Sequence, residues 1–267
     1  MKWTWKTGKK LLYLTIPEWL EQGVTVGFST RGGGESKEPY LALNLALHVN
    51  DNEEDVLRNR NIFLAEFDME SENCVTAQQV HGTEINIVLN KDKGRGMKDI
   101  ATAFSQCDGL LTQESIGMLS FYADCVPLYF FNPEIGIVGI AHAGWKGTAN
   151  KIASKAIQEI KLAGGLVEDT LVGIGPCIKE CCYEVDVNVA SFFKSFHNPH
   201  ILQQHQDKYK LNLAEANKEV LISEGVPNEN IVISDLCTAC NPNLFFSYRR
   251  DGLTGRMGAF IRKRKEF

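Results

Sequence analysis

Short apolar runs alternate with amphipathic stretches along most of this chain. Apolar runs of four to seven residues predict buried strands, whereas apolar positions repeating every three or four residues predict helices that each bury one face. The predicted strands are residues 24–28, 84–89, 118–122, 128–131, 135–141, 171–174, 231–234 and 257–261. The predicted helices are residues 56–67, 149–160, 185–196 and 211–224.

The helix expected after the strand at 135–141 has the clearest pattern. Its apolar positions form one stripe and are Ala149, Ile152, Ala153, Ala156, Ile157 and Ile160. Thr148 is a suitable N-cap, and the glycine pair 164–165 predicts the helix end. Together the elements indicate an α+β protein with several strand pairings between distant segments.

No internal repeat and no Pro/Gly/Ser-rich linker divides the 267 residues, so we predict a single domain over 1–267. Hydrophobic residues make up 44% and charged residues 23%, which is typical of a globular protein and excludes a disordered, collagen-like or coiled-coil chain. The most apolar stretch, 118–143, contains charged residues and lacks the ~20 apolar residues of a membrane span. No apolar secretory segment follows the N-terminus, so we expect a cytoplasmic protein.

Charge and cysteine content narrow the function classes further. The net charge of −5 and the pI near 5.7 argue against a nucleic-acid partner, since such proteins usually carry a basic face. Eight cysteines are too few for a disulfide scaffold in a chain of this length. Some thiols should therefore lie in the core, and others are available as metal ligands or nucleophiles.

Candidate chemistry gathers at the ends of predicted strands. His81, Cys125 and His142 together form a His/Cys/His set, and imidazole and thiolate are the ligands that zinc accepts most readily. Three protein ligands leave the fourth tetrahedral position open, as in catalytic zinc sites. The residues alone leave two other interpretations open, namely a core cysteine with two ordinary histidines, and a Cys125 nucleophile with a histidine base and Asp124 as orienter.

Two further motifs have weaker signals. The segment 142–148 places glycines and Lys146 before a predicted helix, where free N–H groups attract anions, although it is not a Walker A loop. Cys237 and Cys240 form a CxxC that, with Cys177, Cys181 and Cys182, offers a second zinc site. Because only one CxxC exists, we favour core or site-lining thiols for these cysteines.

The order of several motifs then resembles a known family. These motifs are FSTRGG (28–33), LNL (43–45), QVHG (79–82), DGLLT (108–112), ADCVP (123–127), AHAGWKGT (141–148), IGPCI (174–178) and RRDG (249–252). The chain resembles the YfiH-type laccase-domain family over residues 20–262. Members of that family were once called multicopper polyphenol oxidases and are now described as purine nucleoside phosphorylases with adenosine deaminase activity.

The resemblance implies a mixed sandwich layered α/β/β/α and zinc bound by His81, Cys125 and His142, with copper as a possible substitute. It implies phosphorolysis of adenosine, inosine, guanosine and methylthioadenosine, and deamination of adenosine to inosine. No protein partner and no membrane contact are implied.

For these reactions, catalytic roles fall to Asp124, Cys125 and His142. Asp124 would act as a general acid or base, or orient a metal ligand. The candidate substrate-binding residues are Arg31 and Lys146 for phosphate and Asn44 and Gln79 for base or ribose. A turn cap for Asn44 and a surface ion pair for Arg31 are the structural alternatives.

Two other activities remain as alternatives. One is a Cys-His hydrolase acting on cell-wall peptide precursors, to which relatives have been linked. The other is a copper-dependent polyphenol oxidase, but six histidines without an HxH pair cannot furnish three types of copper centre.

Overall fold

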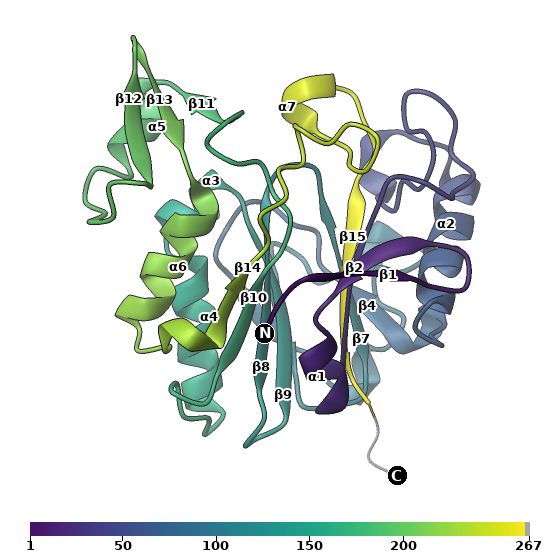
Figure 1. The fold of residues 1–267 in the computed structure, drawn as a ribbon. Helices are drawn as coiled ribbons and strands as arrows, with labels where there is room; N and C mark the ends of the chain where they lie inside the picture. The colour runs from purple at the N-terminus through teal and green to yellow at the C-terminus, as the bar shows by residue number, and fades with distance from the viewer. Residues whose placement is uncertain (265–267) are drawn as a thin grey trace.

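Two six-stranded sheets form the centre of the protein, which we describe over residues 1–264 in a computed structural model (Figure 1). The first sheet contains, in spatial order, β1 (Thr4–Thr7), β2 (Leu12–Thr15), β3 (Val24–Ser29), β15 (Met257–Lys263), β7 (Gly117–Tyr122) and β4 (Cys74–Thr76). The second contains β14 (Ile231–Ile233), β10 (Leu171–Ile174), β8 (Val126–Asn132), β9 (Ile137–Ala143), β6 (Gly109–Thr112) and β5 (Ile85–Ile87).

Helices cover the outer faces of both sheets. The helices are α1 (Pro17–Glu21), α2 (Glu53–Ala65), α3 (Trp145–Ala149), α4 (Ile152–Leu162), α5 (Val187–Ser191), α6 (Leu213–Ser223) and α7 (Tyr248–Asp251). A small third sheet of β11 (Glu184–Val185), β13 (Lys208–Leu211) and β12 (Leu202–His205) lies beside α5 (Figure 1). No helix in the described range 1–264 has the length and apolar character that crossing a membrane requires.

The side chains of β8 show how the layers are built. Leu128 and Phe130 face the helices α4 and α6, whereas Tyr129 and Phe131 face the first sheet. Strand side chains alternate between the two faces, so an all-apolar strand is buried on both. With α2 packed on the far face of the first sheet, the predicted α/β/β/α sandwich is confirmed (Figure 1).

The two ends of the described chain meet in the first sheet. β3 pairs antiparallel with β15, from Phe28 opposite Ala259 to Val24 opposite Lys263. This pairing ties a strand near the start of the described chain to its last strand.

Two predicted helices differ from the structure. The helix expected over 149–160 is two helices, because Lys151 adopts a left-handed φ of 62° between α3 and α4. Thr148 therefore lies inside α3 rather than at an N-cap, and its hydroxyl accepts a 2.9 Å hydrogen bond from Asn217 of α6. The helix expected over 185–196 is confined to α5, because β11 occupies residue 185 and Asp186 caps the helix.

The packing of α4 on the second sheet gives a stability prediction. Ile157 is completely buried, so Ile157→Ala should lower the free energy of unfolding by about 2–5 kcal/mol in urea denaturation. The matched control is Leu162→Ala on the same helix, where the side chain is 80% exposed and little change is expected. Equal effects of the two variants would contradict this description of the core.

Candidate metal centre and adjoining cavities

Three separate segments bring His81, Cys125 and His142 together. His81 lies in the loop after β4, Cys125 in the turn between β7 and β8, and His142 within β9. β8 pairs with β9 so that Pro127 lies opposite His142, which brings the turn carrying Cys125 beside that histidine. One ligand atom from each of the three residues lies within 4.8 Å of the others, and Cys125 Sγ is 3.9 Å from His81 Nε2.

Asp108, which precedes β6, orients two members of this set. Its carboxylate lies 2.9 Å from His142 Nδ1 and accepts backbone N–H bonds from Val80, His81 and Gly82 at 2.7–3.0 Å. A carboxylate on one ring nitrogen of a histidine leaves the other nitrogen to bind a metal. We did not assign this role from the sequence, where Asp108 is only the first letter of the DGLLT motif.

The metal-free site favours a thiolate beside an imidazolium. Burial opposes ionisation of the Cys125 thiol, but the His142 and His81 imidazoles outweigh it and lower its pKa to about 6. Burial likewise opposes protonation of His142, but Cys125 and Asp108 raise its pKa to about 9. The site therefore offers a ready sulfur anion to an incoming cation.

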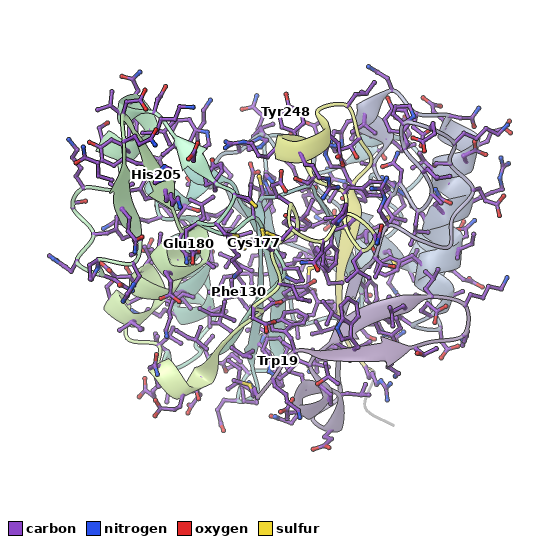
Figure 2. All side chains as sticks on the ribbon, turned by 45° about the horizontal axis from the view of Figure 1, so that its top comes forward. Trp19, Phe130, Cys177, Glu180, His205 and Tyr248 are labelled. Carbon is purple, nitrogen blue, oxygen red and sulfur yellow. The ribbon has the colours of Figure 1, made fainter. Side chains whose placement is uncertain are left out.

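Two cavities flank the three residues. The larger has a volume of about 420 Å³, and its walls include Trp145, Ile178, Tyr183, Leu213 and Arg249. The smaller has a volume of about 280 Å³, and its walls include His48, Gln79, Phe121, His142 and Arg256. Both are lined by His81, Ala123, Cys125 and Tyr248, so these residues form a shared wall. Tyr248 lies at the start of α7, above the two sheets (Figure 2).

Three hydrogen bonds from the protein engage the Asp124 carboxylate. The residue lines the larger cavity, but its carboxylate accepts hydrogen bonds from the Thr238 hydroxyl (2.7 Å), the Ser247 hydroxyl (3.0 Å) and the Arg249 backbone N–H (2.7 Å). These bonds join the turn that carries Cys125 to the C-terminal segment. Of the two roles predicted for Asp124, this geometry favours the orientation of a metal ligand.

Only some of the predicted substrate-binding residues lie at these two cavities. Gln79 lines the smaller cavity, although its carboxamide exchanges two 2.8 Å hydrogen bonds with the backbone of Phe121. Asn44 is fully buried and accepts a 2.9 Å hydrogen bond from the backbone N–H of Arg256, which does line that cavity. Asn44 therefore contacts the backbone of a cavity-wall residue and does not itself line either cavity.

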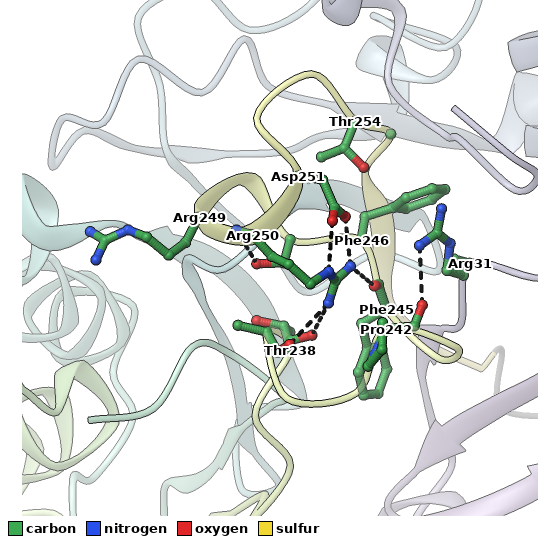
Figure 3. A network of polar contacts seen from close by, with 12 residues as sticks. Arg31, Thr238, Pro242, Phe245, Phe246, Arg249, Arg250, Asp251 and Thr254 are labelled. Atoms are coloured by element: carbon green, nitrogen blue, oxygen red, sulfur yellow. Dashed lines mark hydrogen bonds and ion pairs between the residues drawn. The ribbon is translucent and has the colours of Figure 1, made fainter. Parts of the chain in front are cut away.

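Arg31 and Lys146 are absent from both cavity walls in the described part of the chain. The Arg31 guanidinium donates to the carbonyls of Leu41 and Pro242 at 3.0–3.1 Å, as Figure 3 shows for Pro242. Lys146 is exposed, with its ammonium 5.6 Å from the centre of the Trp145 ring. Arg249 and Arg256 are instead the cationic side chains of the cavity walls.

Sequence reasoning missed several wall residues. His48, Trp145, Tyr183, Tyr248, Arg249 and Arg256 come from loops and short helices far apart in the chain. The RRDG and AHAGWKGT motifs contain two of them, and this motif membership was the available signal. Burial together with Arg256 and Arg60 lowers the pKa of His48 to about 4, so its imidazole is neutral at pH 7.

Comparisons with known proteins show the family to which the chain belongs. The family model described as multi-copper polyphenol oxidoreductase laccase matches residues 25–264. Purine nucleoside phosphorylase YlmD of Geobacillus stearothermophilus is 42% identical over 92% of both chains, and the Bacillus subtilis protein of the same name is 37% identical over 93% of both.

Two solved structures share the fold closely. The hypothetical protein YfiH of Bacillus licheniformis has a TM-score of 0.93 at 38% identity, covering 97% of this chain and 99% of its own. YlmD of Geobacillus stearothermophilus also has a TM-score of 0.93, at 40% identity over 98% and 99% of the two chains. The chain therefore belongs to the laccase-like family that includes YfiH and YlmD.

The role of Asp108 gives a prediction about metal affinity. Asp108→Asn keeps the shape of the side chain but removes the charge that faces His142, so zinc affinity should fall about 10–100-fold in competition with a chromogenic chelator. Asp92→Asn replaces another buried carboxylate, which bonds to the Leu89 backbone and Arg95, and should leave zinc affinity unchanged. Unchanged affinity in Asp108→Asn would contradict the orienting role.

The ion pair gives a prediction about pH. In metal-free protein, alkylation of Cys125 by iodoacetamide should be fast above about pH 6 and slow below it, because the thiol becomes protonated as pH falls through its lowered pKa. Peptide mass spectrometry separates Cys125 from the other cysteines. His142→Gln should move the midpoint upward, toward the ordinary thiol value of about 8.5. A midpoint already near that value in the unaltered protein would refute the ion pair.

Proposed function

We propose that this protein is a purine nucleoside phosphorylase that holds one zinc ion through His81, Cys125 and His142 and also deaminates adenosine. The observation that carries the proposal is that the three candidate ligand atoms, within 4.8 Å of one another, lie at the junction of two cavities. The names of the relatives that span almost the whole chain support it. The expected cytoplasmic location remains a prediction.

The donor set fits zinc. Two imidazoles and one thiolate are ligands that zinc accepts, and Asp108 already fixes the orientation of His142. A bound zinc ion would supply a Lewis acid and lower the pKa of a coordinated water. Copper would suit the same donors, and the affinity order of divalent metals favours copper over zinc.

The cavity walls suggest how a nucleoside and phosphate would be arranged. Trp145, Tyr183 and Tyr248 give the larger cavity flat aromatic surfaces against which a purine can stack. Arg256 and the neutral His48 give the smaller cavity a cation and a hydrogen-bonding group for phosphate or ribose. Phosphate would then approach ribose C1′ from the smaller cavity as the purine leaves into the larger one.

In this arrangement, the reaction would be a phosphorolysis. The bond from ribose C1′ to the purine nitrogen breaks, a bond from C1′ to a phosphate oxygen forms, and the purine nitrogen gains a proton. Arg256, in the wall of the smaller cavity, would stabilise the phosphate anion beside the positive charge that develops at C1′. Arg249 would lie on the purine side, in the wall of the larger cavity. Asp124 would keep Cys125 and Arg249 in place.

The test is incubation of zinc-loaded protein with inosine and phosphate, followed by separation of hypoxanthine and ribose 1-phosphate. Cys125→Ala should lower the rate at least about 100-fold, because a lost ligand removes several kcal/mol of electrostatic stabilisation. Cys74→Ala is the matched control, since Cys74 is buried far from the site beneath α2 and should retain activity. Adenosine without phosphate should yield inosine in the same protein.

If hypoxanthine formed no faster than with Cys125→Ala, the phosphorylase would be excluded. The second candidate is the Cys-His hydrolase, which the lowered pKa of Cys125 favours. Peptide hydrolysis that survives a chelator but is lost on alkylation of Cys125 would support it. Its substrates would be cell-wall peptide precursors.

A further inference from the structure

Four cysteines form a second sulfur cluster outside the site described above. One sulfur atom from each of Cys181, Cys182, Cys237 and Cys240 lies within 4.8 Å of the other three. Cys240 Sγ is 3.5 Å from Cys181 Sγ and 3.3 Å from Cys182 Sγ. The expectation of core or site-lining thiols is thus wrong for Cys181 and Cys240, which are exposed and line neither cavity. It holds for Cys177 and Cys237, which are buried.

The spacing of the four sulfur atoms matches a tetrahedral ion. A zinc–sulfur bond of about 2.3 Å in a regular tetrahedron places the sulfurs about 3.8 Å apart. The shortest contacts are slightly closer than that, and none exceeds 4.8 Å, so small rotations of the side chains suffice. Four protein sulfurs would close the coordination shell, which is the arrangement of structural rather than catalytic zinc sites.

The surrounding backbone is built to hold these sulfurs. The Lys179 backbone N–H donates to Cys237 Sγ at 3.4 Å, a contact that stabilises a thiolate. The Arg250 guanidinium donates to the carbonyls of Thr238 and Ala239 at 3.1 Å, which fixes the loop between the two cysteines of the CxxC (Figure 3). The same guanidinium pairs with the Asp251 carboxylate at 2.6 Å, which holds it in this position.

The cluster is also directly connected to the cavity walls. Thr238, inside the CxxC, donates from its hydroxyl to Asp124 and from its backbone N–H to the Cys177 carbonyl at 3.1 Å. The Ile178 backbone N–H donates to the carbonyl of Asp124 at 2.9 Å. Figure 2 shows Cys177 near the centre of the molecule, with Glu180 to its left and Tyr248 above it.

From these contacts we propose that Cys181, Cys182, Cys237 and Cys240 bind a structural zinc ion. This ion ties the loop after β10, which supplies Ile178 and Tyr183 to the wall of the larger cavity, to the segment between β14 and α7. That segment leads directly into α7, whose Tyr248 and Arg249 line the same cavity. The sequence alone does not decide whether this site exists, because adjacent cysteines and a single CxxC do not form the usual two spaced pairs. The proposal is independent of the reaction that the protein catalyses.

The experiment removes the first site to isolate the second. Cys125→Ala protein, purified without added metal, should contain about one zinc ion per chain by mass spectrometry of the elements. Adding Cys181→Ser and Cys240→Ser, at two exposed positions that should not disturb the core, should remove that ion. Adding Cys177→Ala instead is the matched control, because Cys177 is a neighbour whose sulfur lies outside the cluster, and zinc should be retained.

A second measurement identifies the ligands. Replacement of zinc by Co²⁺ in Cys125→Ala protein should give the strong sulfur-to-cobalt charge-transfer absorption of a four-thiolate site, and the double serine variant should lack it. The proposal is overturned if Cys125→Ala protein holds no zinc and its thiols react freely, if it holds iron, or if intact mass shows that two of the four cysteines form a disulfide.

Discussion

The turn between β7 and β8 is the constraint on which the site depends. β7 ends at Tyr122 in the first sheet, and β8 begins at Val126 in the second, so three residues must cross from one sheet to the other. Asp124 does this with a φ of 89°, a conformation that is costly for a residue other than glycine. Its three accepted hydrogen bonds offset that cost, and they hold Cys125 where both cavities meet.

One carboxylate performs the corresponding task for the two histidines. Asp108 receives the backbone of the loop that carries His81 and also faces the ring of His142. A buried carboxylate must be paired or hydrogen-bonded to remain charged. The contacts that stabilise Asp108 therefore also fix the ring of His142 and the backbone of the loop that carries His81. The sandwich thus supplies a rigid frame, and two aspartates help to bring the three candidate metal ligands together.

Part of this account follows from the sequence. Strands such as β8 and β9 were predictable because burial on both faces makes them largely apolar. His81, Cys125 and His142 could be selected as candidate ligands because zinc accepts few residue types. The helix break at Lys151 was not predictable, since the apolar stripe of α4 continues into α3 without interruption.

The rest depends on contacts between distant segments. Asp108 and Asp124 act through partners 26 to 125 residues away, and nothing local marks which carboxylate will be buried. Arg31 and Lys146 were predicted as phosphate contacts from charge and, for Lys146, from its place before a predicted helix, whereas the folded chain places Arg249 and Arg256 at the cavity walls. Likewise, only the tertiary structure brings the adjacent cysteines 181 and 182 close to the two cysteines of the CxxC.

The central claim is that three side chains hold one ion and leave a free coordination position beside the cavities. Anomalous diffraction at the zinc absorption edge, from crystals of protein purified with zinc, tests it most directly. We predict a peak at bonding distance from His81, Cys125 and His142, about 2.0–2.3 Å, with a fourth ligand that does not come from the protein. A peak elsewhere with these side chains unligated, or a fourth protein atom completing the tetrahedron, would contradict the account.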